Sequence, residues 1–297
     1  MTDHRTGRVQ AWLLAARPAT LWASVTPVVV AGALAAADGA FRVDIFVAVL
    51  AVAALLQVAV NFANDLEDAV RGVDTEHRTG PPRAVASGLI TPGAMRLGIG
   101  VVVAAATLCG LYVAFVSGPE MLLIGLAAVL AALGYSGGPR PYASLGLGEV
   151  SVFVFFGPVV TVGSRYAFDR SAPRDAWVAS VVMGLLAAAI LVANNLRDIP
   201  TDEAAGKRTL AVRIGDRATR RLYMVLVTLA FAVLLLGASA RWLPAWSVLG
   251  LIAVPFAVTV TRPVTSGATA AGLVPVLVGT SRLLALTGSL MAVGILV

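Results

Sequence analysis

Half of the chain's 16 acidic residues fall in two short segments, and these are the residues best suited to carry chemistry. One segment covers residues 65–76 and the other covers residues 198–203. Their acids are Asp65, Glu67, Asp68, Asp74 and Glu76 in the first segment, and Asp198, Asp202 and Glu203 in the second. Carboxylates are costly to keep at the edge of apolar sequence, so clusters of them there indicate a functional site.

The two acidic segments are related by an internal repeat. Residues 63–68 read Ala-Asn-Asp-Leu-Glu-Asp and residues 193–198 read Ala-Asn-Asn-Leu-Arg-Asp, at an offset of 130 residues. The pair Arg-Thr recurs at the same offset, at positions 78 and 208. In a parallel repeat of membrane helices, corresponding segments emerge on the same face of the membrane. We therefore expect the two acidic segments to face each other across one cavity.

Helical spacing aligns the polar residues of each segment along one helix face. The residues are Asn61, Asp65 and Asp68 at i, i+4 and i+7, and Asn194, Asp198 and Asp202 at i, i+4 and i+8. A single aspartate in such a position needs no functional role, because water at a helix end can solvate it or a nearby arginine can pair with it. Two repeated sets with flanking amides point to function instead.

Two facing sets of carboxylates and amides suit a metal-bound diphosphate. Their oxygens are hard ligands for Mg²⁺, which completes its coordination with phosphate oxygens. Two such ions would clamp a diphosphate and stabilise it as a leaving group. Basic residues beside both segments supply further donors to phosphate, and they are Arg71, Arg78, Arg83, Lys207 and Arg208. Because the flanking sequence is apolar, we predict an intramembrane enzyme that acts on a lipid diphosphate.

Membrane helices must hold these residues in place. Of the 297 residues, 59% are hydrophobic and only 13% are charged, whereas a soluble domain has roughly 25% charged residues. Apolar stretches of about 20 residues, long enough to cross the hydrocarbon layer, lie near residues 19–37, 44–64, 94–116, 120–136, 146–165, 176–197, 220–240, 243–261 and 273–296. We expect an all-α polytopic membrane protein, a nine-transmembrane-helix bundle with an internal parallel repeat of about four helices. It forms a single domain over residues 1–297, with pseudo-repeats near 19–136 and 146–261 and a final helix at 273–296.

The basic residues indicate how the bundle is oriented. With nine spans, 16 of the 22 basic residues fall on the side of the N-terminus and five on the other. Cytoplasmic loops retain such residues, so we expect the N-terminus and the site in the cytoplasm and the C-terminus outside. Lys207 is the only lysine, and no basic surface with interleaved aromatic residues occurs, which argues against nucleic-acid binding. The bias toward Arg, Ala, Gly and Val suggests a bacterial source, and we expect the plasma membrane.

Four stretches resemble the UbiA superfamily of intramembrane aromatic prenyltransferases. Asn64-Asp65-x-x-Asp68 and Asp198-x-x-x-Asp202, after the second and sixth spans, are similar to its paired aspartate motifs. The four stretches cover residues 12–21, 61–92, 134–149 and 194–210. The Gly-Pro-Pro-Arg-Ala-Val and Gly-Gly-Pro-x-Pro-Tyr runs within them are similar to the branch that prenylates 1,4-dihydroxy-2-naphthoate. One departure is Asn195, which stands where the first repeat has Asp65 and leaves the second motif with fewer carboxylates.

The resemblance implies an activity, a cofactor and a set of site residues. The activity is transfer of a polyprenyl chain from polyprenyl diphosphate to 1,4-dihydroxy-2-naphthoate, with loss of CO₂ and diphosphate, to give a demethylmenaquinone. The cofactor is Mg²⁺, with two ions. The implied metal ligands are Asp65, Asp68, Asp198, Asp202, Asn61, Asn64 and Asn194. The implied catalytic residues are the same four aspartates with Lys207 and Tyr135, and the implied substrate contacts are Arg17, Arg71, Asp74, Arg78, Arg83, Tyr142, Glu149, Lys207 and Arg208.

Four of these residues also have simpler interpretations. Tyr135 and Tyr142 would place aromatic faces near a developing cation, but tyrosine is also common at membrane interfaces. Arg17 would pair with the carboxylate of the acceptor, or extend to the membrane surface as long basic side chains do. Glu149 would contact the acceptor, or favour the start of a helix by its charge.

Two alternative functions stay open at this point. One is prenylation of another aromatic acceptor by the same superfamily, such as 4-hydroxybenzoate, homogentisate, or a chlorin or haem precursor. The other is a secondary transporter, which also contains repeats and intramembrane acids. Transporters hold such acids near the midplane at helices broken by Gly or Pro. Here the acids cluster at the ends of unbroken apolar runs, which favours the enzyme.

Overall fold

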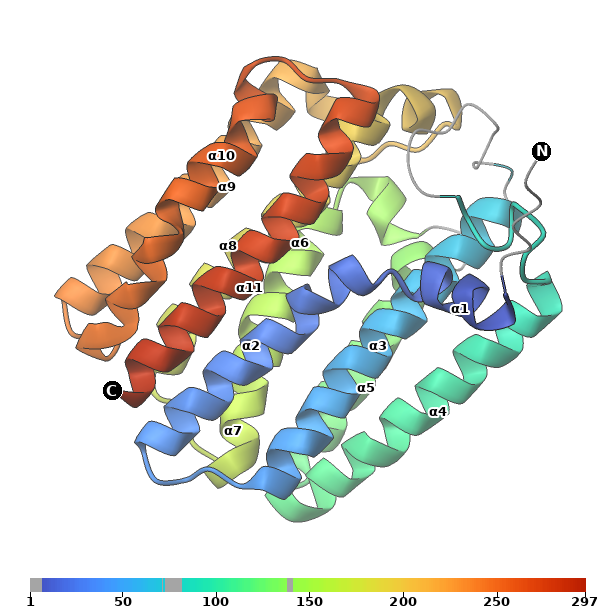
Figure 1. Ribbon diagram of the computed structural model, residues 1–297. Helices are drawn as coiled ribbons and strands as arrows, with labels where there is room; N and C mark the ends of the chain where they lie inside the picture. The colour runs from blue at the N-terminus through green and yellow to red at the C-terminus, as the bar shows by residue number, and fades with distance from the viewer. Residues whose placement is uncertain (1–6, 71, 73–81, 138–140) are drawn as a thin grey trace.

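The computed structural model of the chain describes residues 7–70, 72, 82–137 and 141–297 (Figure 1). All regular secondary structure in these ranges is helical, which confirms the expected all-α fold. The helices are α1 (Arg8–Ala16), α2 (Pro18–Ala37), α3 (Val43–Val70), α4 (Pro92–Ser117), α5 (Glu120–Ser136), η1 (Tyr142–Leu145), α6 (Gly148–Val154), η2 (Phe155–Val162), α7 (Gly163–Asp169), α8 (Arg174–Ala204), α9 (Leu210–Ser239), η3 (Ala245–Ala253), α10 (Val254–Thr265), η4 (Ala270–Leu273) and α11 (Val274–Leu296).

Within the described ranges, eight helical stretches are long and apolar enough to cross a membrane, and the ninth, α5, is shorter. These nine stretches coincide with the nine predicted spans, and the chain is a multi-pass membrane protein. The largest difference is at the start of α9, predicted near residue 220 and observed at Leu210. Residues 210–219 are too polar to be read as a span, but they form helix on both sides of Gly215, whose φ of 77° interrupts it.

Helix α8 lies at the centre of the bundle. It is the most buried of the eight long stretches and contacts α2, α6, η2, α9 and α11. Its Met183 and Leu186 pack with Leu283 and Leu284 of α11 in the main hydrophobic core, where all four are fully buried. By contrast α4 exposes most of its length, as expected of a helix that faces lipid. The helix that carries the second aspartate motif is therefore held by packing along its whole length.

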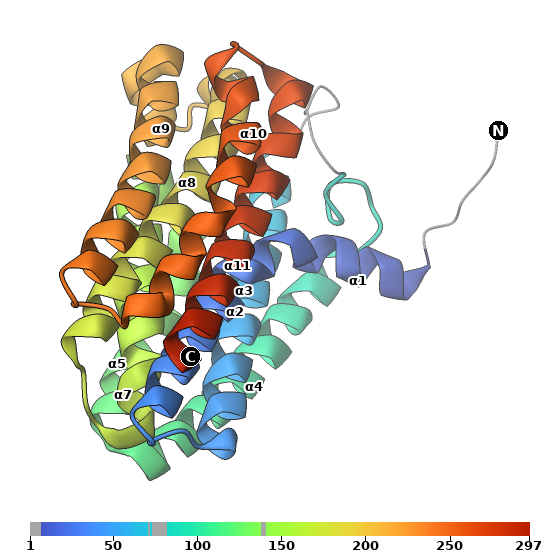
Figure 2. The same cartoon turned by 60° about the vertical axis from the view of Figure 1, so that its left-hand side comes forward.

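A short helix that the sequence analysis did not predict, α1, lies crosswise to the bundle (Figure 2). Its nine residues are too few to be recognised as a span. Ala11 and Ala15 are buried against the end of α3, and the Trp12 ring lies 5.2 Å from the Phe62 ring. Arg17 then takes a left-handed conformation with a φ of 49°, which turns the chain into α2.

The fifth predicted span, 146–165, is divided into α6, the π-helix η2 and α7. Pro158 lies inside η2 and lacks the N–H that a regular helix needs at that position. Gly157 of η2 packs directly on Gly184 of α8, and a Cβ on Gly157 would lie 2.7 Å from the Ser180 carbonyl oxygen. The backbones of η2 and α8 are therefore in direct contact at these two glycines.

The motif-bearing ends of α3 and α8 lie at one end of the bundle, together with α1 (Figure 1). The C-terminus lies at the opposite end (Figure 1). This arrangement brings the two aspartate motifs together, as the repeat interpretation requires. The boundaries of the pseudo-repeats and of the single domain stay predictions.

Candidate active site

A cavity of about 270 Å³ lies between α2, α3, α5, η1, η2 and α8. Along α3 its lining runs from Asp68 down to Ala53, about 22 Å at 1.5 Å per residue. Most of the charged and amide side chains of the lining lie at the motif end and include Asn64, Glu67, Asp68, Asn194, Asn195, Asp198, Asp202 and Lys207. The deeper lining is mainly apolar and includes Ala53, Leu56, Ala128, Phe155, Phe156, Val160, Ala187 and Ile190. The cavity thus joins a charged end to a chamber suited to a hydrocarbon chain.

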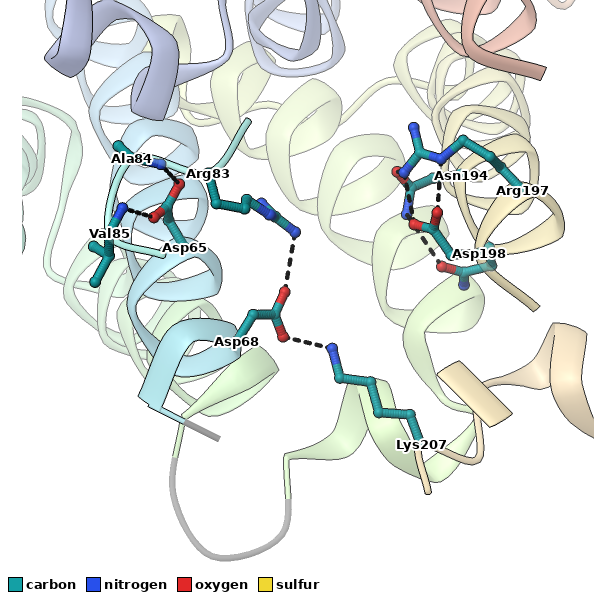
Figure 3. Close-up of polar contacts among 10 residues, drawn as sticks. Asp65, Asp68, Arg83, Ala84, Val85, Asn194, Arg197, Asp198 and Lys207 are labelled. Atoms are coloured by element: carbon teal, nitrogen blue, oxygen red, sulfur yellow. Dashed lines mark hydrogen bonds and ion pairs between the residues drawn. The ribbon is translucent and has the colours of Figure 1, made fainter. Parts of the chain in front are cut away.

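Asp68 of the first motif is held between two basic residues (Figure 3). Its Oδ2 accepts a hydrogen bond from Arg83 Nη2 at 3.0 Å, and its Oδ1 accepts one from Lys207 Nζ at 2.5 Å. Lys207 follows α8, so this contact links the segments that carry the two motifs. All three residues line the cavity.

Asp65 points away from this cluster (Figure 3). Its Oδ2 accepts from the backbone N–H of Ala84 at 3.0 Å, and its Oδ1 accepts from that of Val85 at 2.8 Å. The residue is 2% exposed and is not part of the cavity lining. In this arrangement the Asp65 carboxylate holds the turn that carries Arg83. Its expected role as a metal ligand and catalytic residue stays a prediction.

The second motif is organised around Asp198 on α8 (Figure 3). Arg197 binds its carboxylate through two hydrogen bonds, Nε to Oδ1 at 2.7 Å and Nη2 to Oδ2 at 2.6 Å. The same Nη2 donates to Asn194 Oδ1 at 2.9 Å, and Asn194 Nδ2 donates to Asp198 Oδ2 at 3.3 Å. Asp202 lies one turn further, buried and within electrostatic reach of Asp68, Asp198 and Lys207.

Two residues of the site were missed by the sequence analysis. Arg197 was counted only among the basic residues that indicate orientation, although it stands beside Asp198 in the second copy of the repeat, where the first copy has Glu67. Glu67 was counted among the acids but given no role, and it lines the cavity. The adjacency of Arg197 and Asp198 was the available signal, because a guanidinium at a buried helix end needs a carboxylate partner.

The fit of a metal depends on what now binds these carboxylates. No group of three His, Cys, Asp or Glu side chains in the described part of the chain is arranged to hold a metal ion. Instead, guanidinium and ammonium groups are bound to Asp68 and Asp198. The donor set is nevertheless hard oxygen, which suits Mg²⁺, and the bound cations are of the kind that bind phosphate. The residues therefore fit a Mg²⁺–diphosphate complex that exchanges partners with these side chains.

Asn61 lines the cavity but is engaged within the protein. Its Nδ2 donates to the Ala16 carbonyl oxygen at 2.7 Å and to Thr20 Oγ1 at 2.9 Å, and its Oδ1 accepts from Gln57. It lies seven residues before Asp68, about 10 Å along the helix. Asn61 thus shares the cavity with the motif carboxylates, and its expected place among the metal ligands stays a prediction.

Tyr135 and Tyr142 meet edge to face in the cavity wall, with ring centroids 5.5 Å apart. The Tyr142 hydroxyl donates to the Ala131 carbonyl oxygen at 2.6 Å and accepts from Ser151 Oγ at 3.3 Å. Burial raises the pKa of the Tyr142 phenol, so it stays a neutral donor at physiological pH. Tyr135 lines the cavity and is within electrostatic reach of Asp68 and Arg17.

Glu149 lies behind the cavity wall rather than in it. It is 7% exposed, and its Oε1 accepts from Asn195 Nδ2 at 2.9 Å. Asn195 is the residue that lines the cavity. Glu149 thus contacts the cavity wall through the Asn195 amide, and its expected substrate contact stays a prediction.

The other predicted substrate contacts divide into three groups. Arg17 and Arg83 line the cavity. Arg208 is exposed and outside the lining, and its expected role stays a prediction. Three residues, Arg71, Asp74 and Arg78, lie outside the described part of the chain.

Comparison with known proteins identifies the family. A family model described as the UbiA prenyltransferase family matches residues 24–272. The chain belongs to the UbiA prenyltransferase family. Among curated members, the chain is 42% identical to the 1,4-dihydroxy-2-naphthoate octaprenyltransferase of Mycobacterium tuberculosis (strain ATCC 25618 / H37Rv), with 90% of each chain covered. It is 35% identical to the protein of that name in Escherichia coli (strain K12), over 99% of this chain and 98% of that one.

A solved structure of a UbiA homologue from Archaeoglobus fulgidus bound to GPP and Mg²⁺ has the same fold. Its TM-score to this chain is 0.65 at 14% identity, and the match covers 95% of this chain and 99% of that one. As a UbiA prenyltransferase the protein is a membrane enzyme, and the secondary-transporter alternative is wrong. The cavity offers what prenyl transfer needs: oxygen ligands and cations at one end, and an apolar chamber below them.

Proposed function

We propose that this protein transfers a polyprenyl chain from polyprenyl diphosphate to 1,4-dihydroxy-2-naphthoate with Mg²⁺ as cofactor. The observation that carries the proposal is the cavity itself, in which two facing aspartate motifs stand above an apolar chamber. The name of the two curated relatives, which cover nine-tenths or more of the chain, supports the choice of acceptor.

The charged end of the cavity binds the diphosphate. The proposed ligands of two Mg²⁺ ions are Asn64, Asp68, Asn194, Asp198 and Asp202, all of which line the cavity. When bound, Mg²⁺ neutralises the diphosphate and makes it a better leaving group. Lys207 and Arg83, which both line the cavity, now bind Asp68. In the complex they would bind phosphate oxygens in place of Asp68. Arg71 and Arg78 are proposed to add to this cluster.

The chemistry breaks a carbon–oxygen bond in the donor and forms a carbon–carbon bond to the acceptor. Departure of diphosphate leaves an allylic cation, which the Tyr135 ring face stabilises. The acceptor ring attacks at the carbon that bears the carboxylate, and its hydroxyl proton is lost as the ring becomes a β-keto acid. Release of CO₂ and uptake of one proton restore the aromatic ring as the quinol form of demethylmenaquinone.

The acceptor is proposed to lie where Arg17 enters the cavity. Arg17 lines the cavity one helical turn before Thr20, and its guanidinium provides a charge-assisted partner for the carboxylate of the acceptor. The neutral hydroxyl of Tyr142 is held by Ala131 and Ser151, which fixes the ring that borders the same space. A water-excluding wall of this kind protects the cation from hydrolysis.

The decisive experiment supplies purified protein with labelled polyprenyl diphosphate, Mg²⁺ and one acceptor at a time. We expect a lipid-soluble product from 1,4-dihydroxy-2-naphthoate and stoichiometric release of CO₂ from its labelled carboxyl group. Prenylation of 4-hydroxybenzoate would retain the carboxyl group. A product formed only from that acceptor, without CO₂, would overturn the choice of acceptor but not the enzyme class.

We further propose that the protein lies in the bacterial plasma membrane with its N-terminus and active site in the cytoplasm. The distribution of basic residues supports this orientation. A reporter enzyme that is active only outside the cytoplasm should give activity when fused after Val297, at the end of the bundle opposite the site. The matched fusion after Gly206 should be silent, and the reverse pattern would overturn the orientation.

A further inference from the structure

A chain of hydrogen bonds fixes the orientation of the Gln57 amide beside the cavity. It starts at the Ala16 carbonyl oxygen, which can only accept, and which binds Asn61 Nδ2 at 2.7 Å. The Asn61 oxygen must therefore face the other way, where it accepts from Gln57 Nε2 at 3.3 Å. Because the nitrogen of Gln57 is committed to Asn61, its oxygen is directed elsewhere.

Thr20 supports the same assignment. Its hydroxyl has one proton, which it donates to the Arg17 carbonyl oxygen at 2.9 Å. It can therefore only accept from its neighbours, and it accepts from Asn61 Nδ2 at 2.9 Å and from Gln57 Nε2 at 3.4 Å. Both observations leave the Oε1 atom of Gln57 as the end of the chain of hydrogen bonds.

Gln57 Oε1 is buried and has no hydrogen-bond partner within the protein. Gln57 is only 8% exposed, and it lines the cavity between the charged end and the apolar chamber. A buried carbonyl oxygen without a donor destabilises the protein, because it has lost its hydrogen bonds to water without replacement. Such an atom beside a binding cavity is best explained by a donor that the ligand brings.

The substrates differ in whether they can bring that donor. A polyprenyl chain is hydrocarbon, and a diphosphate presents oxygens that accept hydrogen bonds. Among the groups of the proposed substrates, only the hydroxyls of the aromatic acceptor can donate. We propose that Gln57 Oε1 accepts a hydrogen bond from a ring hydroxyl of the acceptor, which makes Gln57 a specificity-determining residue. This role rests on the proposed function.

The chemistry of the acceptor selects one of its two hydroxyls. In 1,4-dihydroxy-2-naphthoate the 1-hydroxyl is next to the carboxylate and donates to it within the molecule. The 4-hydroxyl lies on the other side of the ring and is free to donate to the protein. Thr20 donates to the backbone carbonyl oxygen of Arg17 and accepts from Gln57 Nε2, and Arg17 and Gln57 both line the cavity. One ring bound there can pair its carboxylate with the Arg17 guanidinium and its 4-hydroxyl with Gln57.

The test compares two competitive inhibitors that differ only in the position of their hydroxyl, 4-hydroxy-2-naphthoate and 1-hydroxy-2-naphthoate. Inhibition constants report binding and do not require either compound to react. In the unmodified protein we expect the 4-hydroxy compound to bind about tenfold more tightly, as one satisfied hydrogen bond allows. Equal inhibition constants would overturn the proposal without any variant.

Gln57→Met keeps the length of the side chain and removes the acceptor oxygen. We expect it to raise the KM for 1,4-dihydroxy-2-naphthoate about tenfold and to make the two inhibitors equal. The KM for polyprenyl diphosphate should change less than about twofold, which separates this role from general damage. Gln10→Met is the matched control, because Gln10 is exposed on α1 and outside the cavity.

Gln57→Glu tests the same atom by keeping it, because a glutamate side chain has the same length and also ends in an acceptor oxygen. It should keep the preference for the 4-hydroxy inhibitor, and loss of that preference would contradict the proposal. If the unmodified protein prenylates no naphthoate, the proposed function fails. If it does, but Gln57→Met keeps both the KM and the inhibitor preference, only the role of Gln57 fails.

Discussion

Asp65 provides the sharpest test of the site, because its sequence motif and its contacts point to different roles. Both of its carboxylate oxygens accept backbone N–H groups, from Ala84 and Val85. Asp65→Asn keeps the shape of the side chain but replaces one acceptor oxygen by an NH₂ group. That group would face a backbone N–H, so two donors would meet in a buried position.

The magnitude follows from these contacts. A hydrogen bond to a charged acceptor contributes about 1.5–3 kcal/mol, and a buried N–H without a partner costs about 1–3 kcal/mol. The lost hydrogen bond and the unpaired N–H describe partly the same energy, so the two contributions do not add in full. We expect Asp65→Asn to lower the free energy of unfolding by about 2–4 kcal/mol. The released turn carries Arg83, whose Nη2 lies 3.0 Å from Asp68 Oδ2. We therefore also expect the KM for polyprenyl diphosphate to rise about tenfold.

The assay combines thermal unfolding in detergent with steady-state kinetics at several Mg²⁺ concentrations. Asp68→Asn is the comparison within the motif, because Asp68 lines the cavity. Asp216→Asn is the control for the substitution itself, since Asp216 is exposed and paired with Arg220 on α9. We expect Asp65→Asn to unfold earlier with an unchanged Mg²⁺ requirement, and Asp68→Asn to raise the Mg²⁺ requirement with little loss of stability.

One result would refute this reasoning. If Asp65→Asn left the unfolding transition unchanged and raised the Mg²⁺ concentration needed for half-maximal activity as Asp68→Asn does, Asp65 would be a metal ligand.

Three further predictions concern the two ends of the bundle. Asp68→Ala and Asp198→Ala should each abolish turnover in a folded protein, and Mg²⁺-dependent activity in either variant would contradict their proposed role. Lys207→Ala should raise the KM for polyprenyl diphosphate about tenfold to a hundredfold. The control substitution Arg208→Ala, at the exposed neighbouring residue, should change this KM little. At the opposite end, Arg165 is buried and binds Asp38 and Asp169, each at 2.6 Å. Because both carboxylates are partly exposed, Arg165→Met should cost only about 1–3 kcal/mol of unfolding free energy, measured by denaturation, and should leave the KM values unchanged.

The fold was predictable where hydrophobic length decides it. The apolar runs predicted nine helical stretches, because backbone groups in hydrocarbon must be satisfied within one helix. The π-helix η2 and the break at Arg17 were not predictable in this way, since each depends on how neighbouring helices pack. Helix α1 was missed because its nine residues bury one face against α3 instead of crossing the membrane.

The candidate site was predictable as a location and less so as a set of contacts. Helical spacing correctly brought Asp68, Asp198 and Asp202 to one cavity. It could not separate Asp65 from them, because the two backbone N–H groups that bind Asp65 come from a turn 19 and 20 residues later in the chain. Spacing on one helix gives no information about a partner that arrives from elsewhere. The same reason hid the link between Glu149 and Asn195, which are 46 residues apart.

The contact between Gly157 and Gly184 limits how this family member can change by mutation. A Cβ on Gly184 would lie 2.7 Å from the Phe153 carbonyl oxygen, so any larger residue must displace backbone. Such a displacement moves Phe155 and Phe156, which line the deep chamber. By contrast, Ala128 on α5 lines the same chamber and is not part of this close backbone contact. A substitution at Gly157 or Gly184 would therefore change the chamber by moving backbone, whereas a substitution at Ala128 would change it through the side chain that lines it.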